Sequence, residues 1–241
     1  MRPLIQVLRQ QGAPPPELEL VARYGDDVLA FWRSTSQPLL LMRVAAAVGV
    51  EPKVSIGIAC RATEAVIDYV GPNEPRPRYA LDAARLWLAG KVEAGTCARA
   101  GQLAEEVAQS YREARQQVHK AERRKYRAAA YAAFAAARTA FAARDAAVTM
   151  ELEYGADYTF EDAWNGAKVG CALTAGQVLL DACEAACSAT AVQVTLETSS
   201  AMAGAAAAND TRLVALAWAS RIIRDELAET VIAEGTKRLL G

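Results

Sequence analysis

The sequence predicts an all-α protein, either a multi-helix bundle or an irregular α-solenoid with a long alanine-rich central helix. Alanine, the best helix former, makes up roughly a fifth of the chain and is most frequent between Arg127 and Ala147. Apolar residues recur every three or four positions in many segments, as on the buried face of a helix. Few segments alternate β-branched and aromatic residues with polar ones, which is the pattern of strands.

The length of 241 residues, with 53% apolar and 23% charged residues, is ordinary for a globular protein with a sizeable core. We expect a single all-α domain over residues 1–241. A subdivision into short helices (1–91) and a long-helix bundle (92–241) is also possible. No repeat of fixed length is visible, so the sequence favours a bundle over a solenoid.

Prolines and glycines divide the first part of the chain into short helices. Proline suits the first turn of a helix, and an aspartate such as Asp27 suits the position just before it. One expected helix begins at Glu17. Four others are expected over 27–33, 38–48, 52–70 and 79–89.

The stretch from Val92 to Glu151 contains no proline. It predicts one helix or two helices joined near 119–126. Beyond a turn at 153–157, helices are expected from Glu161 to Met202 with possible breaks at glycines, then a connection over 203–210 and a last helix over 211–240. Within the alanine-rich part, four larger side chains share one helix face at heptad spacing: Tyr131, Phe134, Arg138 and Phe141.

Charge and cysteine usage narrow the classes of function. The net charge is −1 and the pI about 6.0, so no nucleic-acid partner is expected. Five cysteines fit no disulfide framework, and no signal peptide is recognisable at the start, which predicts reduced core thiols and a cytoplasmic location. The most apolar stretch, 170–198, is interrupted by Asp181, Glu184 and Gln193, so no membrane span is expected.

No catalytic, cofactor or metal site is expected. The one histidine, His119, leaves little room for a zinc enzyme or a catalytic triad. Cys183 and Cys187 lie one helical turn apart but lack further ligands nearby. A glycine-rich phosphate loop is also missing. We therefore interpret the chain as a non-catalytic binding protein; an enzyme would need a polar pocket with perturbed pKa values.

One acidic and aromatic segment is the candidate partner-binding surface. Aromatic anchors surrounded by charge are typical of interface hot spots. Acidic residues at this place also suit the start of the following helix. The candidate residues are Glu153, Asp157, Tyr158, Glu161, Asp162 and Trp164.

The loop and helix at 75–90 carry the most specific motif: Pro75-Arg76-Pro77-Arg78-Tyr79-Ala80-Leu81, followed by Trp87-Leu88-Ala89-Gly90-Lys91. Ala30-Phe31-Trp32 and Leu39-Leu40-Leu41-Met42 precede it, and the alanine-rich helix follows. Over residues 24–150, this order resembles an alanine-rich helical family of immunity proteins from bacterial polymorphic-toxin systems. Leu81 stands where that family usually has isoleucine.

The resemblance implies that the protein binds and neutralises a cognate toxin in the cytoplasm by occlusion, without turnover. If that toxin is a nuclease with a basic face, the acidic segment would suit it. In the motif, Arg76, Pro77, Trp87 and Gly90 are expected to be structural, with Arg76 capping helix carbonyls and Trp87 filling the core. The alternative function is a helical scaffold or adaptor that self-assembles or binds a host protein. The oligomeric state stays open.

Overall fold

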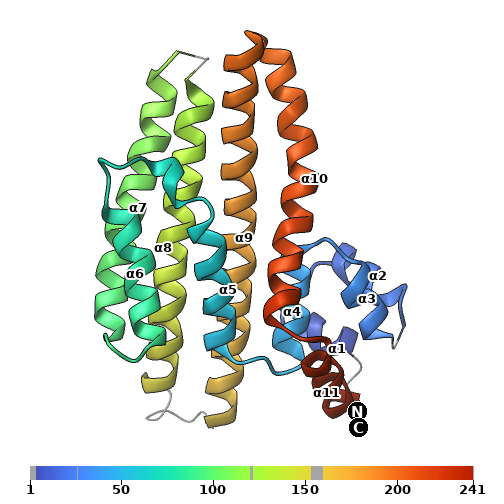
Figure 1. Cartoon of the computed structure of the whole chain (residues 1–241). Coiled ribbons are helices and arrows are strands. Elements are labelled where there is room, and N and C mark those ends of the chain that lie inside the picture. The colour runs from blue at the N-terminus through green and yellow to red at the C-terminus, as the bar shows by residue number, and fades with distance from the viewer. Residues whose placement is uncertain (1–3, 26, 120–121, 153–159, 241) are drawn as a thin grey trace.

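The computed structural model of the protein describes residues 4–25, 27–119, 122–152 and 160–240, with the side chains of 148–165 and 240 outside the description. Within this part of the chain, the structure consists of α-helices and one short 3-10 helix, without strands (Figure 1). The prediction of an all-α multi-helix bundle is confirmed.

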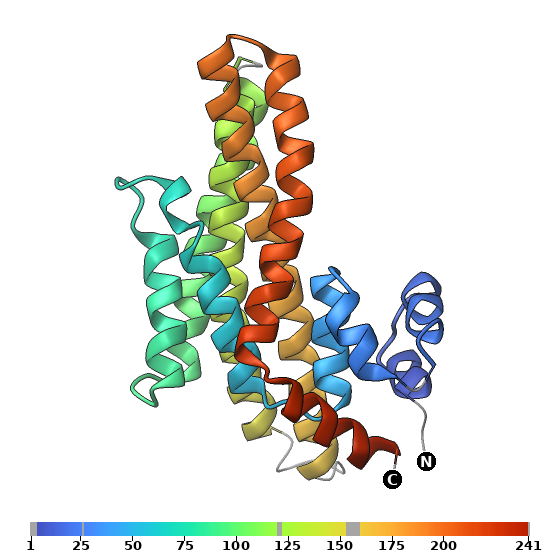
Figure 2. The same ribbon diagram turned by 45° about the vertical axis from the view of Figure 1, so that its right-hand side comes forward.

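Four long helices lie side by side in the order of the chain (Figures 1 and 2). α8 packs between α7 and α9, and α9 packs between α8 and α10. We call this arrangement the row, and α7 and α10 form its two edges. The row consists of α7 (Ala94–Gln117), α8 (Arg123–Leu152), α9 (Phe160–Thr198) and α10 (Ala201–Glu226).

Short helices cover one side of the row. α4 packs on α9, α5 packs on α8 and α9, and α6 packs on α7 and α8. Proline occupies the first turn of α2, α4, α5 and α6, and the Asp27 carboxylate accepts a hydrogen bond from the Ala30 N–H at the start of α3. The helices that cover the row are α4 (Pro38–Ala47), α5 (Pro52–Glu64), the 3-10 helix η1 (Ile67–Val70) and α6 (Arg76–Leu88). The other short helices are α1 (Leu4–Gln10), α2 (Pro15–Ala22), α3 (Val28–Ser34) and α11 (Glu229–Leu240); α1 packs on α4 and α2, and α11 packs on α3.

The structure settles which helices of the second half are continuous. The stretch 92–151 forms two helices, α7 and α8. The helix α9 is not interrupted at Gly166, Gly170 or Gly176, where the sequence allowed for breaks. The connection over 203–210 is wrong, because these residues belong to α10. Gly176 lies against Leu39 of α4, and Gly204 lies against Ala191 of α9, so both glycines serve close packing. The last expected helix divides at Leu227 into α10 and α11.

The alanines of α8 are buried on nearly every side of the helix. Its alanines from 128 to 146 are at most 4% exposed, and small side chains let helix axes approach toward the lower end of the ~8–10 Å range. All five cysteines are free and buried, as expected from the sequence. Burial raises the pKa values of the Cys60, Cys171 and Cys183 thiols to about 12, so these thiols stay protonated at neutral pH.

By length and composition alone, one helical segment in the described part of the chain, Gly166–Thr198 of α9, could cross a membrane. In the structure this segment packs against α8, α10, α4 and α5, and 56% of its most apolar stretch is buried. A core helix of a soluble protein has the same composition, and the position of α9 inside the row is consistent with that role.

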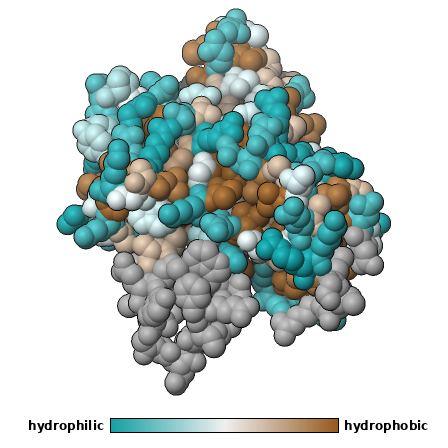
Figure 3. Space-filling model, turned by 60° about the horizontal axis from the view of Figure 1, so that its bottom comes forward, coloured by the Kyte–Doolittle hydropathy of each residue, from teal (hydrophilic) through white to brown (hydrophobic). Residues whose placement is uncertain are grey.

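The underside of the molecule brings helices from both ends of the chain together. Figure 3 shows apolar surface in the middle of this face, bordered by hydrophilic side chains. A cavity of about 670 Å³ lies between α1, α4, α9 and α11. Val7, Ala46, Val169 and Leu239 contribute apolar atoms to its wall. The first and last helices are therefore both packed near the start of α9.

Gly235 allows α11 to contact the end of α4. A Cβ atom at this position would meet the Val48 carbonyl oxygen and lie 2.7 Å from the Val48 Cβ. We expect Gly235→Ala to lower the free energy of unfolding by ~1–3 kcal/mol, although alanine is the better helix former. Gly57→Ala in α5 is the matched control, since nothing lies within 4 Å of its Cβ position. Chemical denaturation measures both; equal stabilisation of the two variants would contradict the contact.

Candidate functional site

The predicted acidic surface falls at the connection between α8 and α9. Glu153, Asp157 and Tyr158 lie outside the described residues. The first turns of α9 include the other three, whose side chains are not described: Glu161, Asp162 and Trp164. The acidic docking surface therefore stays a prediction, and the site below is built from other residues.

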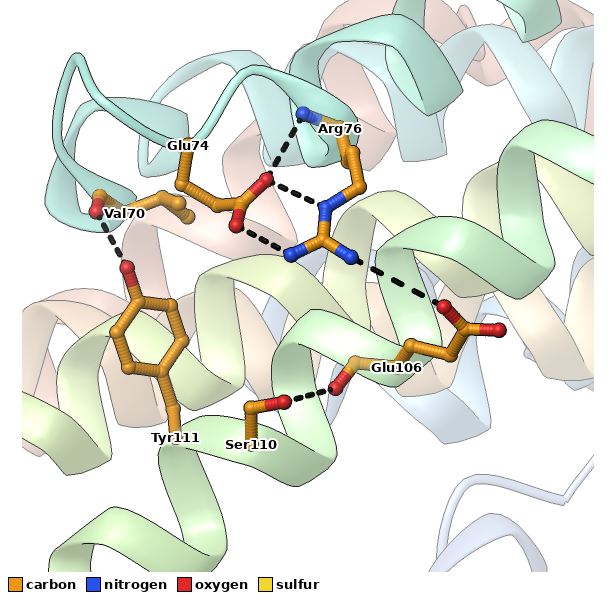
Figure 4. Close-up of polar contacts among 6 residues, drawn as sticks. All are labelled: Val70, Glu74, Arg76, Glu106, Ser110 and Tyr111. Carbon is orange, nitrogen blue, oxygen red and sulfur yellow. Dashed lines mark hydrogen bonds and ion pairs between the residues drawn. The ribbon is translucent and has the colours of Figure 1, made fainter.

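The motif around Arg76 clamps the loop before α6 onto α7 (Figure 4). Arg76 does not cap helix carbonyls. Its guanidinium binds the Glu74 carboxylate through two hydrogen bonds of 2.7 and 2.5 Å and lies 3.9 Å from Glu106 of α7. The hydrogen bond from Arg76 lowers the pKa of Glu74. On the same side, the Tyr111 hydroxyl donates to the Val70 carbonyl at 2.9 Å.

The other motif residues sit around α6. Pro77 is buried in its first turn. Trp87 does not fill the core; it is half-buried at the margin of a second apolar cluster that contains Leu81 and Cys97. Gly90 has a φ of 68° in the turn after the helix, a conformation that favours glycine. All of these positions have a structural explanation.

A different surface has the features of a binding site. Tyr131, Phe134, Arg138 and Phe141 lie on the one face of α8 that remains half-buried while its alanines are buried. The heptad spacing of these residues thus corresponds to a real face of the helix, and this face is bounded by α7 on one side and α9 on the other.

A cavity of about 440 Å³ occupies this face, and we call it the α8 groove. Four of its lining residues are arginines and two are carboxylates. From α7 come Glu105, Gln109, Arg112 and Arg115; from α8 come Arg127, Ala130, Tyr131, Phe134 and Arg138; and from α9 comes Asp181.

Aromatic rings order the guanidinium groups of the α8 groove. Arg112 and Arg138 lie over the Phe134 ring, with 5.8 and 5.4 Å from guanidinium carbon to ring centroid. Arg127 lies 5.4 Å over the Tyr131 ring. The negative face of an aromatic ring attracts a cation at these distances. Arginines held in this way lose less conformational entropy when they bind a ligand.

Two of the four arginines form ion pairs with carboxylates of α9. Arg138 pairs with Asp181, which is 3% exposed and also accepts a 3.3 Å hydrogen bond from Gln177. Burial raises the pKa of Asp181, and the Arg138 charge and hydrogen bond oppose this shift. Arg127 pairs with Glu184 at 2.7 Å, and Glu184 also pairs with Arg212.

The remaining two arginines keep their charge available. Within the described part of the chain, neither Arg112 nor Arg115 forms an ion pair, and Arg112 donates only a weak hydrogen bond of 3.4 Å to Gln109. The Nε atom of Arg127 is buried without a hydrogen-bond acceptor. The groove therefore presents hydrogen-bond donors that lack acceptors. A bound carboxylate would supply these acceptors.

The heptad spacing predicts the aromatic face of α8 but not the α8 groove. Arg112 and Arg115 belong to another helix, and no spacing rule connects them to Phe134. No group of three potential metal ligands gathers among the residues that the structure describes. The chain matches no protein-family model, no curated protein and no solved structure, so its resemblance to immunity proteins stays an expectation.

Proposed function

We propose that the protein is a non-catalytic binding protein whose α8 groove holds an acidic segment of a partner protein. The observation that carries this proposal is the presence of two unpaired arginines, Arg112 and Arg115, beside the ordered aromatic ring of Phe134. The planar guanidinium fork binds carboxylates through two parallel hydrogen bonds. Arginine and aromatic residues are also the types that contribute most to protein interfaces.

The charges around the groove favour a short acidic segment over a polyanion. The exposed side of α7 next to the arginines carries Glu105, Glu106 and Glu113. A nucleic-acid backbone extends its charge well beyond the groove and would meet these carboxylates. The net charge of −1 gives no long-range attraction for such a ligand either. A protein segment with a few carboxylates can match the arginines alone.

Residues 24–150 resemble immunity proteins, and on this basis we propose that the partner is a cognate bacterial toxin. The protein would neutralise this toxin in the cytoplasm by covering part of its surface. The α8 groove would contact acidic residues of that toxin. The acidic segment at 153–164, opposite in sign, would contact basic ones. Binding of this kind requires occlusion and complementary charge, with no chemical step.

The proposal predicts the effect of reversing the two unpaired charges. We expect Arg112→Glu combined with Arg115→Glu to weaken partner binding about 100-fold, because both carboxylate contacts become repulsive. Tagged protein would first be used to capture the partner from native cell extract for identification by mass spectrometry. The affinity of the purified partner would then be measured by calorimetry for the original protein and each variant.

The matched control is Arg99→Glu on the same helix, because Arg99 is exposed and lies away from the groove. This variant should bind the partner with unchanged affinity. Expression of the partner alone should stop growth, and co-expression of this protein should restore it. Equal affinity of all variants would exclude the α8 groove as the binding site. Recovery of a harmless host protein would exclude a toxin as the partner and would support an adaptor function.

A further inference from the structure

The middle of the outer face of α10 has no neighbour within the described part of the molecule, whereas near the end of the helix Arg224 donates hydrogen bonds to the carbonyls of Trp32 and Thr35. α10 packs against α9 along its length and against α4 and α5 near its end, and it forms one edge of the row (Figures 1 and 2). On the opposite side, Leu213 and Val214 are 74% and 68% exposed. They are adjacent large apolar side chains near the middle of the helix.

Two opposite charges flank this apolar pair. Asp210 precedes it and Arg221 follows it, and both are exposed. Among the described residues neither forms an ion pair or a side-chain hydrogen bond. Arg221 lies eleven positions after Asp210, which corresponds to about three helical turns, or roughly 16 Å, so both side chains lie on the same face. Between Asp210 and Arg221 the face thus runs from a negative residue through an apolar centre to a positive one.

We propose that this face pairs antiparallel with the same face of α10 in a second copy of the chain. In the two-fold register that brings Asp210 opposite Arg221 of the second copy, the same contact forms twice by symmetry. That register also places Val214 opposite Ala217 of the second copy. Alanines at 203, 206 and 217 of the same face allow the two helix axes to approach closely.

The outer face of α10 is complementary to itself, which favours a second copy of the chain as its binding partner. A face that runs from negative to positive matches itself when it is turned end to end, whereas an unrelated partner would need the same order of charges by coincidence. The contact lies outside the α8 groove, whose lining residues come from α7, α8 and α9. Pairing through α10 therefore leaves the groove accessible and would join two grooves in one particle.

The test is the dissociation constant of the full chain, measured by sedimentation equilibrium at low salt. The original protein should show a reversible monomer–dimer equilibrium. Leu213→Glu should raise the dissociation constant at least about tenfold, because a charge replaces an apolar contact near the two-fold axis. Asp210→Arg and Arg221→Asp should each raise it about tenfold, since each variant creates two like-charge contacts.

The combined variant Asp210→Arg with Arg221→Asp restores opposite charges and should return the dissociation constant to near its original value. Leu103→Glu on α7 is the matched control, since Leu103 is an exposed leucine on the other edge of the row; it should leave the equilibrium unchanged. Far-UV circular dichroism checks that every variant is folded. A protein that stays monomeric at its highest soluble concentration would overturn the proposal. A combined variant whose dissociation constant is as high as those of the single variants would also overturn it. The same holds if Leu103→Glu dissociates the dimer.

Discussion

Replacing Arg138 with methionine is expected to lower the free energy of unfolding by about 3–5 kcal/mol, which is the usual cost of leaving a buried charge without its partner. The cost arises at Asp181, whose side chain is 4% exposed and would keep only the hydrogen bond from Gln177. Methionine retains most of the apolar stem of the arginine, so the change removes mainly the guanidinium charge, which also lies over the Phe134 ring. Urea denaturation at pH 7 measures the effect.

The pH dependence identifies Asp181 as the source of this loss. Burial already raises the pKa of Asp181, and removal of the Arg138 charge would raise it further. A carboxyl group whose pKa is higher in the folded state than in the unfolded state stabilises the fold when protonated. That contribution is lost as pH rises through the folded-state pKa. The deficit of Arg138→Met should therefore shrink as pH falls from 7 toward 5.

A double variant provides the control for this experiment. Arg138→Met combined with Asp181→Leu removes both charges and should recover most of the lost stability, because a buried ion pair replaced by apolar side chains is often nearly neutral. A deficit below about 1 kcal/mol in the single variant would show that water reaches Asp181. A deficit that does not change with pH would point to lost packing by the arginine stem.

Replacing Trp32 with alanine is expected to cost about 3–5 kcal/mol, the range for deleting a large buried aromatic side chain. Trp32 of α3 is fully buried. Its carbonyl oxygen accepts a 2.9 Å hydrogen bond from the Nε of Arg224, and the same guanidinium donates to the carbonyl of Thr35. The side chain and these bonds together attach α3 to α10. Thermal unfolding and hydrogen exchange at α3 would record the loss.

Trp32→Phe separates ring volume from hydrogen bonding. The indole Nε1 is buried without an acceptor in the structure, so its removal breaks no bond. Phenylalanine fills much of the same space and should cost clearly less than alanine. Equal losses in the two variants would mean that the indole N–H has a partner, such as a buried water molecule.

The sequence predicted the short helices of the first half better than the long helices of the second. Prolines at 38 and 52 and the cap at Asp27 are local signals, and each acts in the structure as expected. Gly176 and Gly204 gave a misleading local signal. Each glycine costs helix propensity, but tertiary packing against Leu39 and Ala191 outweighs that cost.

The candidate site shows the same division between local and tertiary information. The heptad spacing of Tyr131, Phe134 and Phe141 predicted a shared face because these residues belong to one helix. Whether an arginine is paired depends on which helix packs beside it. For this reason Arg138 and Arg112 look alike in the sequence, yet only Arg138 has a carboxylate partner in the structure.

The order of the helices in space also bears on how the chain folds. Neighbours in the row are neighbours in the sequence, so their contacts close short loops at little entropic cost. α4 differs, because Leu40 and Leu41 are fully buried and their helix packs mainly on α9, far along the chain. During synthesis α4 leaves the ribosome long before α9 exists. Until then its apolar side chains are exposed, and this early segment is the one that most needs protection from aggregation.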